Sequence, residues 1–207
     1  FNGSESGCTI PHNLGGTPAF IIIKGYNVDQ HWACWHQNLT AKSEYRILFS
    51  DDADELQQDG AGKYFPNEPD GTNITCGSDD GQGGSTSEYI MYAWKEVSGV
   101  SKFGKYEGQG NTDISITDQS GALNCGFTPR FLITKNLDFD GSSWEIKDAF
   151  RDGANPRDTA LHVDNDGAEG SSTSAYGVNF VTDGFEITGN GTHLNRSGDT
   201  YIYIAFA

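Results

Sequence analysis

The feature that most constrains the fold of this chain is an internal repeat. Five sequence blocks recur in the same order at a nearly constant spacing of 111 to 113 residues. The blocks begin at residues 17, 31, 48, 70 and 88 and recur at residues 128, 143, 161, 183 and 200. Duplication of one unit, with single-residue insertions in turns, explains such an ordered series. We therefore expect two homologous units, residues 1–97 and 98–207, with a short bridge at residues 95–105.

The repeated blocks have the composition of β-strands. Short runs rich in Ile, Val, Tyr, Phe and Trp alternate with clusters of Gly, Asn, Asp and Ser, and Gly contributes 27 of the 207 residues. This punctuation is typical of an all-β protein with many turns. The pattern predicts six or seven strands per unit, and hence an all-β chain of two tandem β-sandwich-like (jelly-roll-like) units. The apolar run at residues 201–206 is expected to lie inside a sheet, because an exposed strand of that kind would aggregate.

The chain is strongly acidic. Its 29 Asp and Glu residues outnumber 13 Lys and Arg residues, which gives a formal net charge of −16. A field of this sign repels phosphate, so we expect no nucleic-acid partner. No apolar run approaches the roughly 20 residues of a membrane helix, so no membrane insertion is expected. Because the sequence begins with Phe1, we expect a segment of a longer protein or a processed product.

The four cysteines do not form a recognisable site. Cys8, Cys34, Cys76 and Cys125 include no Cys-x-x-Cys pair and no zinc-finger spacing to a histidine. The favoured interpretation is small buried side chains. One disulfide is the alternative if the protein matures outside a reducing cytosol.

The sequence contains no catalytic signature, and we expect no enzyme activity. Neither Gly-x-Ser-x-Gly nor His-Glu-x-x-His occurs. Glycoside hydrolysis needs two carboxylates about 5 to 9.5 Å apart across a cleft. Adjacent pairs such as Asp51 and Asp52 do not supply that arrangement. No catalytic or cofactor-binding residue is assigned.

Two aspartate-rich turns are weak candidates for a calcium site. Asp138 and Asp140 precede one glycine, and Asp164 and Asp166 precede another. Each stretch resembles the beginning of a calcium loop but lacks its third ligand and its final glutamate. Asp-Gly is also a strong turn signal. Tight turns are therefore the favoured interpretation, and calcium is the alternative.

The tryptophans divide according to the repeat. Trp32 and Trp144 occupy equivalent positions, so we expect both rings to lie in the core. Trp35 has no aromatic equivalent in the second unit, where Lys147 stands. Trp35 and Tyr26 are therefore the candidates for contact with a ligand such as a sugar.

Two blocks carry patterns that go beyond strand signals. Residues 99–110 read Gly-x-Ser-Lys-Phe-Gly-x-Tyr-x-Gly-x-Gly, and residues 199–207 end the chain with an aromatic-rich strand. Both resemble a repeated β domain of tailed-phage virion proteins, especially tail fibres of phages of marine and cyanobacterial hosts. Further likenesses lie at residues 9–15, 125–131, 148–152 and 183–185. The resemblance covers nearly the whole chain, departs at residues 48–49 and in the acidic middle loops, and implies a virion location without implying a reaction.

These observations lead to one expected function and several alternatives. We expect a non-enzymatic virion structural protein, a phage tail fibre or surface-appendage module that contacts host surface glycan or protein. Its expected location is the virion surface, outside the cell. Expected partners are other virion subunits, including further copies of this chain in a homo-oligomer, and a host surface polysaccharide. The alternatives are a purely structural capsid-decoration, filament or shaft subunit, a secreted bacterial adhesin, and a glycan depolymerase.

Overall fold

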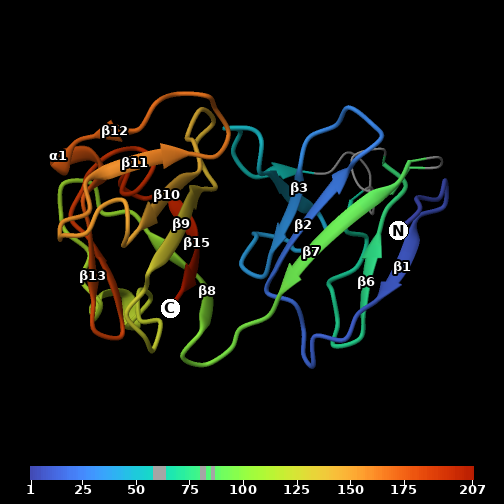
Figure 1. Cartoon of the computed structure of the whole chain (residues 1–207), viewed down its shortest axis with the longest axis horizontal. Coiled ribbons are helices and arrows are strands. Elements are labelled where there is room, and N and C mark those ends of the chain that lie inside the picture. Colours follow the sequence, from blue (N-terminus) through green and yellow to red (C-terminus); the bar gives the residue numbers. More distant parts are fainter. Residues whose placement is uncertain (58–63, 80–82, 85–86) are drawn as a thin grey trace. The chain divides into compact units, whose positions relative to one another are not determined.

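The chain is almost entirely β-structure in the residues that its computed structural model describes, 1–57, 64–79, 83–84 and 87–207. Within these residues, fifteen strands accompany one four-residue helix, α1 (Thr173–Tyr176), and one short 3-10 turn, η1 (Asp118–Ser120). The predicted all-β class is confirmed. Across the same residues, no helix is long and apolar enough to span a membrane. The chain divides into two compact units, residues 1–51 with 55–95 and residues 52–54 with 96–207 (Figure 1).

Unit 1 contains two antiparallel sheets in its described residues. Its strands are β1 (Cys8–Pro11), β2 (Phe20–Gly25), β3 (Ala33–His36), β4 (Tyr45–Leu48), β5 (Leu56–Gln57), β6 (Asn73–Cys76) and β7 (Tyr89–Trp94). Five of them form one sheet in the order β5-β4-β3-β2-β7, and β1 pairs with β6 in the other.

Strand β2 lies inside the larger sheet of unit 1 because its residues are apolar on both faces. Ile21 and Ile23 are fully buried, and Phe20 and Ile22 are 3% and 7% exposed. Strand β2 pairs with β3 on one side and with β7 on the other. A strand with two hydrogen-bonded neighbours and two covered faces needs such an uninterrupted apolar run.

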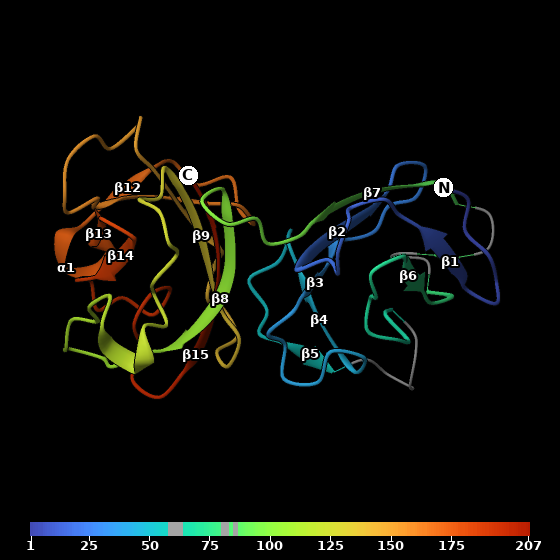
Figure 2. The same ribbon diagram turned by 90° about the horizontal axis from the view of Figure 1, so that it is seen from below.

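Unit 2 repeats the arrangement of a large sheet and a small one. Its strands are β8 (Ser101–Glu107), β9 (Phe131–Asn136), β10 (Glu145–Asp148), β11 (Thr159–His162), β12 (Gly170–Ser171), β13 (Val178–Val181), β14 (Gly184–Ile187) and β15 (Thr200–Phe206). The large sheet has the order β12-β11-β10-β9-β15-β8, and β13 pairs with β14. Figure 2 shows the β13–β14 pair on one side of unit 2 and strands β8, β9 and β15 on the other.

The core of unit 2 lies between these two sheets. Tyr201 and Tyr203 of β15 pack with Phe185 and Ile187 of β14 in one cluster of buried side chains. The Tyr203 ring meets the Phe185 ring edge-on, with centroids 5.0 Å apart. Strand β15 pairs with β9 on one side and β8 on the other, which confirms that the final strand is internal. The burial of apolar surface from both layers makes unit 2 a sandwich.

The larger sheets of the two units share one strand order. The order β5-β4-β3-β2-β7 corresponds to β12-β11-β10-β9-β15. Phe20 of β2 pairs with Trp94 of β7, and Phe131 of β9 pairs with Phe206 of β15. Phe131 lies 111 positions after Phe20, and Phe206 lies 112 positions after Trp94. The duplication stays a prediction from the sequence, and it would produce such a shared order and register.

The unit boundaries differ slightly from the predicted ones. Unit 1 ends at residue 95 rather than 97, and residues 52–54 group with unit 2. Residues 101–105 of the predicted bridge belong to β8, which pairs with β15 along seven residues. This segment is therefore part of the edge strand of the large sheet of unit 2 rather than a linker.

The two sheets differ at the edge beside β7. Phe1 and Tyr89 exchange backbone hydrogen bonds of 2.8 Å, and their rings stack with centroids 5.2 Å apart. Tyr106 of β8 stacks on Tyr201 in the same way, at 5.0 Å. Within the described residues β7 is nevertheless the last strand of its sheet. In the described residues of unit 1, the backbone contacts of Phe1 with Tyr89 and of Asn2 with Glu88 stand where β8 pairs with β15 in unit 2.

Candidate functional site

Trp35 is a core residue, which corrects the prediction that it contacts a ligand. It lies on β3 directly opposite Ile21 of β2 and is 2% exposed. Its indole N–H donates to the Lys42 carbonyl oxygen at 2.8 Å, and its ring packs against Phe65. A buried tryptophan needs such a partner for its N–H. A polar residue at the equivalent position, Lys147, is itself 1% exposed, so the change of residue type between repeats did not indicate a surface.

Trp32 is the exposed tryptophan, which corrects the prediction that it lies in the core. Its side chain is 37% exposed, whereas the equivalent Trp144 is fully buried as predicted. The backbone N–H groups of the two residues make equivalent hydrogen bonds. The Trp32 N–H donates to Ser50 Oγ at 3.1 Å, and the Trp144 N–H donates to Asp164 Oδ1 at 2.8 Å. Equivalent backbone positions thus leave one ring covered and the other open.

Trp32 lines a polar groove of about 500 Å³ in unit 1 together with Lys24, Asp29, Gln30, His31 and Ser50. The loop between β2 and β3 supplies most of these side chains. Lys24 Nζ donates to the Gln30 carbonyl oxygen, which holds the loop over the end of β2. A groove that combines one exposed aromatic ring with several donors and acceptors fits a polar ligand with an apolar face.

Ser50 organises this groove. Its hydroxyl oxygen accepts the Trp32 N–H and lies 3.2 Å from His31 Nδ1. The Phe49 N–H donates to the Trp32 carbonyl oxygen at 2.8 Å, so both backbone groups of Trp32 are bonded. His31 Nδ1 also lies 3.9 Å from Asp51 Oδ2. The groove is therefore held by hydrogen bonds between the segments before β3 and after β4.

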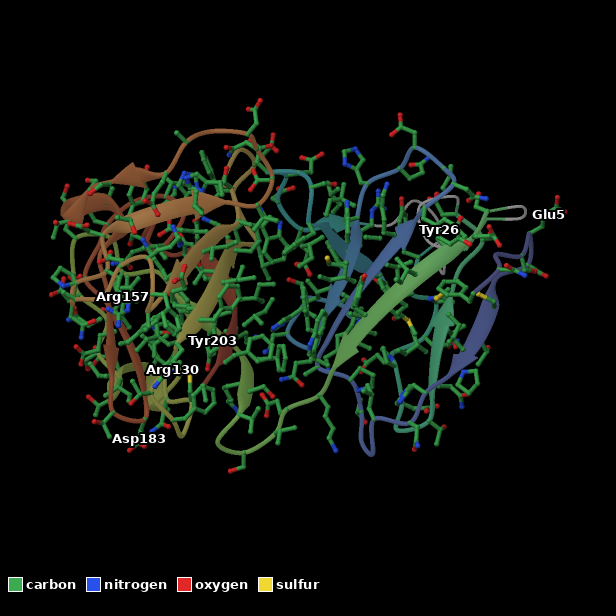
Figure 3. The ribbon with its side chains drawn as sticks, viewed as in Figure 1. Glu5, Tyr26, Arg130, Arg157, Asp183 and Tyr203 are labelled. Atoms are coloured by element: carbon green, nitrogen blue, oxygen red, sulfur yellow. The ribbon has the colours of Figure 1, made fainter. Side chains whose placement is uncertain are left out.

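Tyr26 is exposed, as its predicted role requires, but it does not line the groove. The side chain is 63% exposed and follows the end of β2 (Figure 3). Its N–H donates to the Glu88 carbonyl oxygen at 3.0 Å. A side-chain hydrogen bond with Glu88 raises the pKa of the Tyr26 hydroxyl above its ordinary value.

Two of the four aspartates proposed as calcium candidates, Asp138 and Asp164, accept backbone hydrogen bonds. Asp138 Oδ2 accepts the Thr200 N–H at 2.6 Å, and Asp164 Oδ1 accepts the Trp144 N–H at 2.8 Å. Asp140 precedes Gly141, whose φ of +82° fits a tight turn. Asp166 is exposed in the connection between β11 and β12. In the part of the chain that the structure describes, no group of three or more His, Cys, Asp or Glu side chains could hold a metal ion.

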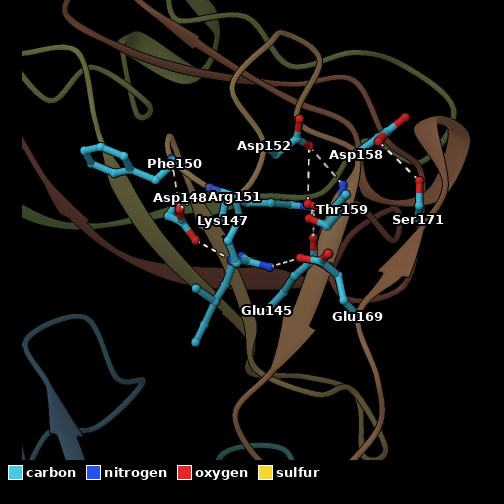
Figure 4. Close-up of polar contacts among 11 residues, drawn as sticks. Glu145, Lys147, Asp148, Phe150, Arg151, Asp152, Asp158, Thr159, Glu169 and Ser171 are labelled. Carbon is cyan, nitrogen blue, oxygen red and sulfur yellow. Dashed lines mark hydrogen bonds and ion pairs between the residues drawn. The ribbon is translucent and has the colours of Figure 1, made fainter.

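A buried ion pair in unit 2 is the feature that the sequence prediction missed. Glu145 and Lys147 both lie on β10, and Lys147 Nζ is 2.7 Å from Glu145 Oε1 (Figure 4). Their side chains are 0% and 1% exposed. Lys147 also donates to the Thr159 carbonyl oxygen at 2.8 Å. The contact with Glu145 is therefore a close ion pair inside unit 2.

Desolvation dominates the electrostatics of this pair. Burial raises the pKa of Glu145 to about 7, although the charge of Lys147 acts in the opposite direction. Burial likewise lowers the pKa of Lys147, against the attraction of Glu145. The desolvation penalty of two buried charges can exceed the energy of their mutual attraction. A substrate does not reach either group, because both side chains are enclosed in the sandwich.

The surroundings of the pair are also polar. His162 lies opposite Glu145 on β11, and the His162 and His193 rings have centroids 5.0 Å apart. Lys147 Nζ lies 5.4 Å from the centre of the Tyr176 ring. Burial, and then the proximity of His162, lowers the pKa of His193. One end of the unit 2 core is therefore lined by titratable side chains.

The ion pair could have been found from the repeat. Glu145 and Lys147 stand where unit 1 has Ala33 and Trp35. In β2 and β3, Ile21 opposes Trp35, and in β9 and β10, Leu132 opposes Lys147. Charged residues that align with core positions of a sister unit signal a buried polar pair, and this alignment was available from the sequence.

A salt-bridged turn follows β10. Arg151 Nε pairs with Asp148 Oδ2, and Arg151 Nη1 pairs with Glu169 Oε1. Asp152 Oδ2 accepts the Thr159 N–H at 3.1 Å. Phe150, between them, is 85% exposed and points away from the ion pair (Figure 4). These contacts stabilise the turn at the end of the strand.

Comparison with known proteins gives a family without an assigned activity. Residues 1–207 match the family described as Domain of unknown function (DUF7483). No curated protein and no solved structure matches the chain. The chain therefore belongs, over its whole length, to the DUF7483 family of domains of unknown function.

Proposed function

We propose that this chain is a non-enzymatic structural module of a phage virion appendage, such as a tail fibre, and that unit 1 contacts a glycan on the host surface. The observation that carries the glycan contact is the groove in which Trp32, 37% exposed, lies beside Asp29, Gln30, His31 and Ser50. The virion location rests on the sequence resemblance at residues 99–110 and 199–207.

The chemistry of the groove favours a saccharide. One face of a sugar ring carries C–H groups that stack on an indole ring, and its hydroxyl groups both donate and accept hydrogen bonds. Trp32 offers the ring, while Asp29, Gln30 and Ser50 offer acceptors and donors. The net charge of −16 disfavours acidic polysaccharides at long range, so a neutral glycan is the preferred class.

The arrangement of the carboxyl groups supports a role without catalysis. Burial raises the pKa of Glu145 to about 7, which is a property that a general acid needs. That carboxyl group is enclosed in the core and paired with Lys147, away from any substrate. The carboxylates near the groove belong to exposed loop residues such as Asp29.

Glycan-array and whole-cell binding test the proposed contact. Trp32→Ala should weaken binding by about fivefold or more, because aromatic anchors contribute more than about 1 kcal/mol. Phe150→Ala is the matched control, since it removes an exposed aromatic residue from unit 2. Equal binding by the Trp32→Ala variant and the unaltered chain would remove the groove from the proposal. Release of reducing sugar from a bound glycan would contradict the non-enzymatic role.

A purely structural module is the competing outcome. Such a module would bind neither glycan nor host cells in any variant. Peptide mapping of purified virions tests the location, and its expected result is the presence of this chain among the appendage proteins. Recovery from secreted bacterial filaments instead would replace the virion role with that of an adhesin.

A further inference from the structure

Two cysteines far apart in the sequence lie opposite each other in unit 1. Cys8 of β1 and Cys76 of β6 are 68 positions apart in the chain, and they are directly paired in the register of the two-stranded sheet. Directly opposed residues of an antiparallel pair have Cα atoms about 4.5–5.5 Å apart. A disulfide spans about 4.4–6.8 Å between Cα atoms, so the pairing meets its backbone requirement.

The local backbone is built for this approach. Gly7 has φ +78°, and a Cβ atom there would lie 2.6 Å from the Cys76 carbonyl oxygen. Only glycine permits that close contact at the beginning of β1. Further along the pair, the His12 N–H donates to the Thr72 carbonyl oxygen at 2.8 Å, which continues the same register. The positions of both cysteines are therefore fixed by the strand pairing.

The two cysteines differ in their exposure to solvent. Cys8 is partly exposed and Cys76 is 1% exposed. Both line a groove of about 300 Å³ that also includes Gly7 and Thr75. A hydrogen bond with Cys76 lowers the pKa of Cys8 to about 7, whereas burial raises the pKa of Cys34 and of Cys125. Cys8 is thus the thiol best suited to attack a reagent from solvent.

We propose that Cys8 and Cys76 form a disulfide bond when the chain meets a small disulfide oxidant such as oxidised glutathione. The Cys8 thiolate attacks one sulfur of the oxidant and releases one glutathione thiolate. Cys76 Sγ then attacks Cys8 Sγ in the mixed disulfide, and its proton passes to the second glutathione thiolate that leaves. Two cysteine thiols are oxidised to one disulfide, and the oxidant is reduced to two glutathione molecules.

The bond would fasten the small sheet of unit 1. It would join strands separated by most of the length of unit 1, and long closed loops restrict the unfolded chain most strongly. Strands β1 and β6 should then open less often. The modification is distinct from the groove at Trp32, because the two sites share no residue.

Thiol counting and peptide mapping test the proposal. The reduced chain, unfolded in denaturant, should label four thiols, and treatment with oxidised glutathione should leave two. Peptide mapping should find the Cys8 peptide joined to the Cys76 peptide. Amide hydrogen exchange in β1 and β6 should slow in the oxidised chain.

Two serine variants control the experiment. Cys8→Ser should form no internal disulfide, while Cys34→Ser, which alters another unit 1 cysteine, should lose the Cys8 and Cys76 thiols as the unaltered chain does. Circular dichroism verifies that each variant is folded. Retention of all four thiols would overturn the proposal. Accumulation of Cys8 as a lasting mixed disulfide, or a link between two chains, would overturn it as well.

Discussion

Two tryptophans three residues apart have opposite environments. Trp35 is enclosed and bonded through its N–H, while the ring of Trp32 borders a groove. We predict that Trp35→Ala destabilises the chain by about 3–5 kcal/mol through cavity formation. Trp32→Ala should cost only about 1–2 kcal/mol, because less apolar area is lost from the buried state. Urea denaturation of both variants measures the difference, and equal costs would contradict the assigned burial.

The ion pair of Glu145 and Lys147 allows a direct exchange with unit 1. The double variant Glu145→Ala/Lys147→Trp gives β10 the residue types that β3 has at the equivalent positions, Ala33 and Trp35. Replacement of a buried ion pair by apolar residues is commonly neutral or stabilising by about 1–4 kcal/mol. Lys147→Ala alone should cost about 3–5 kcal/mol, because it leaves a buried carboxyl group without its partner. A strongly destabilised double variant would show that the pair stabilises unit 2.

Glu145 also predicts a pH dependence. Its folded-state pKa is about 7 against an ordinary value of 4.5, so between these values the folded chain binds more protons at this group than the unfolded chain. The contribution of Glu145 to the free energy of unfolding is therefore complete below about pH 4.5 and declines as the pH rises to about 7. Glu145→Gln removes this titration. Its stability relative to the unaltered chain should rise across the window, by at most about 1.4 kcal/mol per pH unit. A constant difference between the two proteins would contradict the assigned pKa direction.

Residue burial was the part of the site least accessible from sequence. The repeat identified Trp32 and Trp144 as equivalents, and their backbone contacts agree. It gave no information on what covers each ring. The change from Trp35 to Lys147 was interpreted as a surface signal, although both side chains are buried. Long-range packing decides side-chain exposure, and a single sequence does not encode it locally.

At the scale of strands, the edges of the two large sheets make a matched comparison. Tyr203 and Ala205 of β15 pair with Gly104 and Lys102 of β8. Their equivalents on the outer side of β7 are Met91 and Ala93, where β7 ends its sheet in the described residues. Backbone N–H groups at a sheet edge open to solvent more readily than internal ones.

We therefore predict faster amide exchange at Met91 and Ala93 than at Tyr203 and Ala205. Ile90, whose N–H faces β2 through the pairing of Ile90 with Lys24, is the internal control within β7. Hydrogen exchange followed by NMR measures all of these positions. Equal protection at Met91 and Tyr203 would mean that a further strand covers the β7 edge.

Strand positions were the part of the fold most accessible from sequence. The apolar runs at residues 19–23 and 201–206 correspond to β2 and β15, which are both internal strands. The pairing of β1 with β6 was not predictable, because short alternating strands of average polarity fit many partners. Cys8 and Cys76 lie opposite each other because of that pairing, so their proximity was not predictable either.

For the whole molecule, the two units have a common strand order but differ in surface chemistry. Unit 1 has the Trp32 groove, whereas the equivalent Trp144 of unit 2 is enclosed. Unit 2 instead buries charged and titratable groups on the face that is apolar in unit 1. In the proposed function, this difference assigns glycan contact to unit 1 and a supporting role to unit 2.

The central claim is that a glycan binds at the Trp32 groove, and the indole N–H resonances of the four tryptophans test it directly. Titration with a saccharide selected by the glycan array should shift the Trp32 resonance in a saturable manner. The resonances of Trp35 and Trp144 should stay unchanged, because both rings are buried. An unchanged Trp32 resonance at saturating saccharide, or a shift confined to Trp94, would contradict the claim.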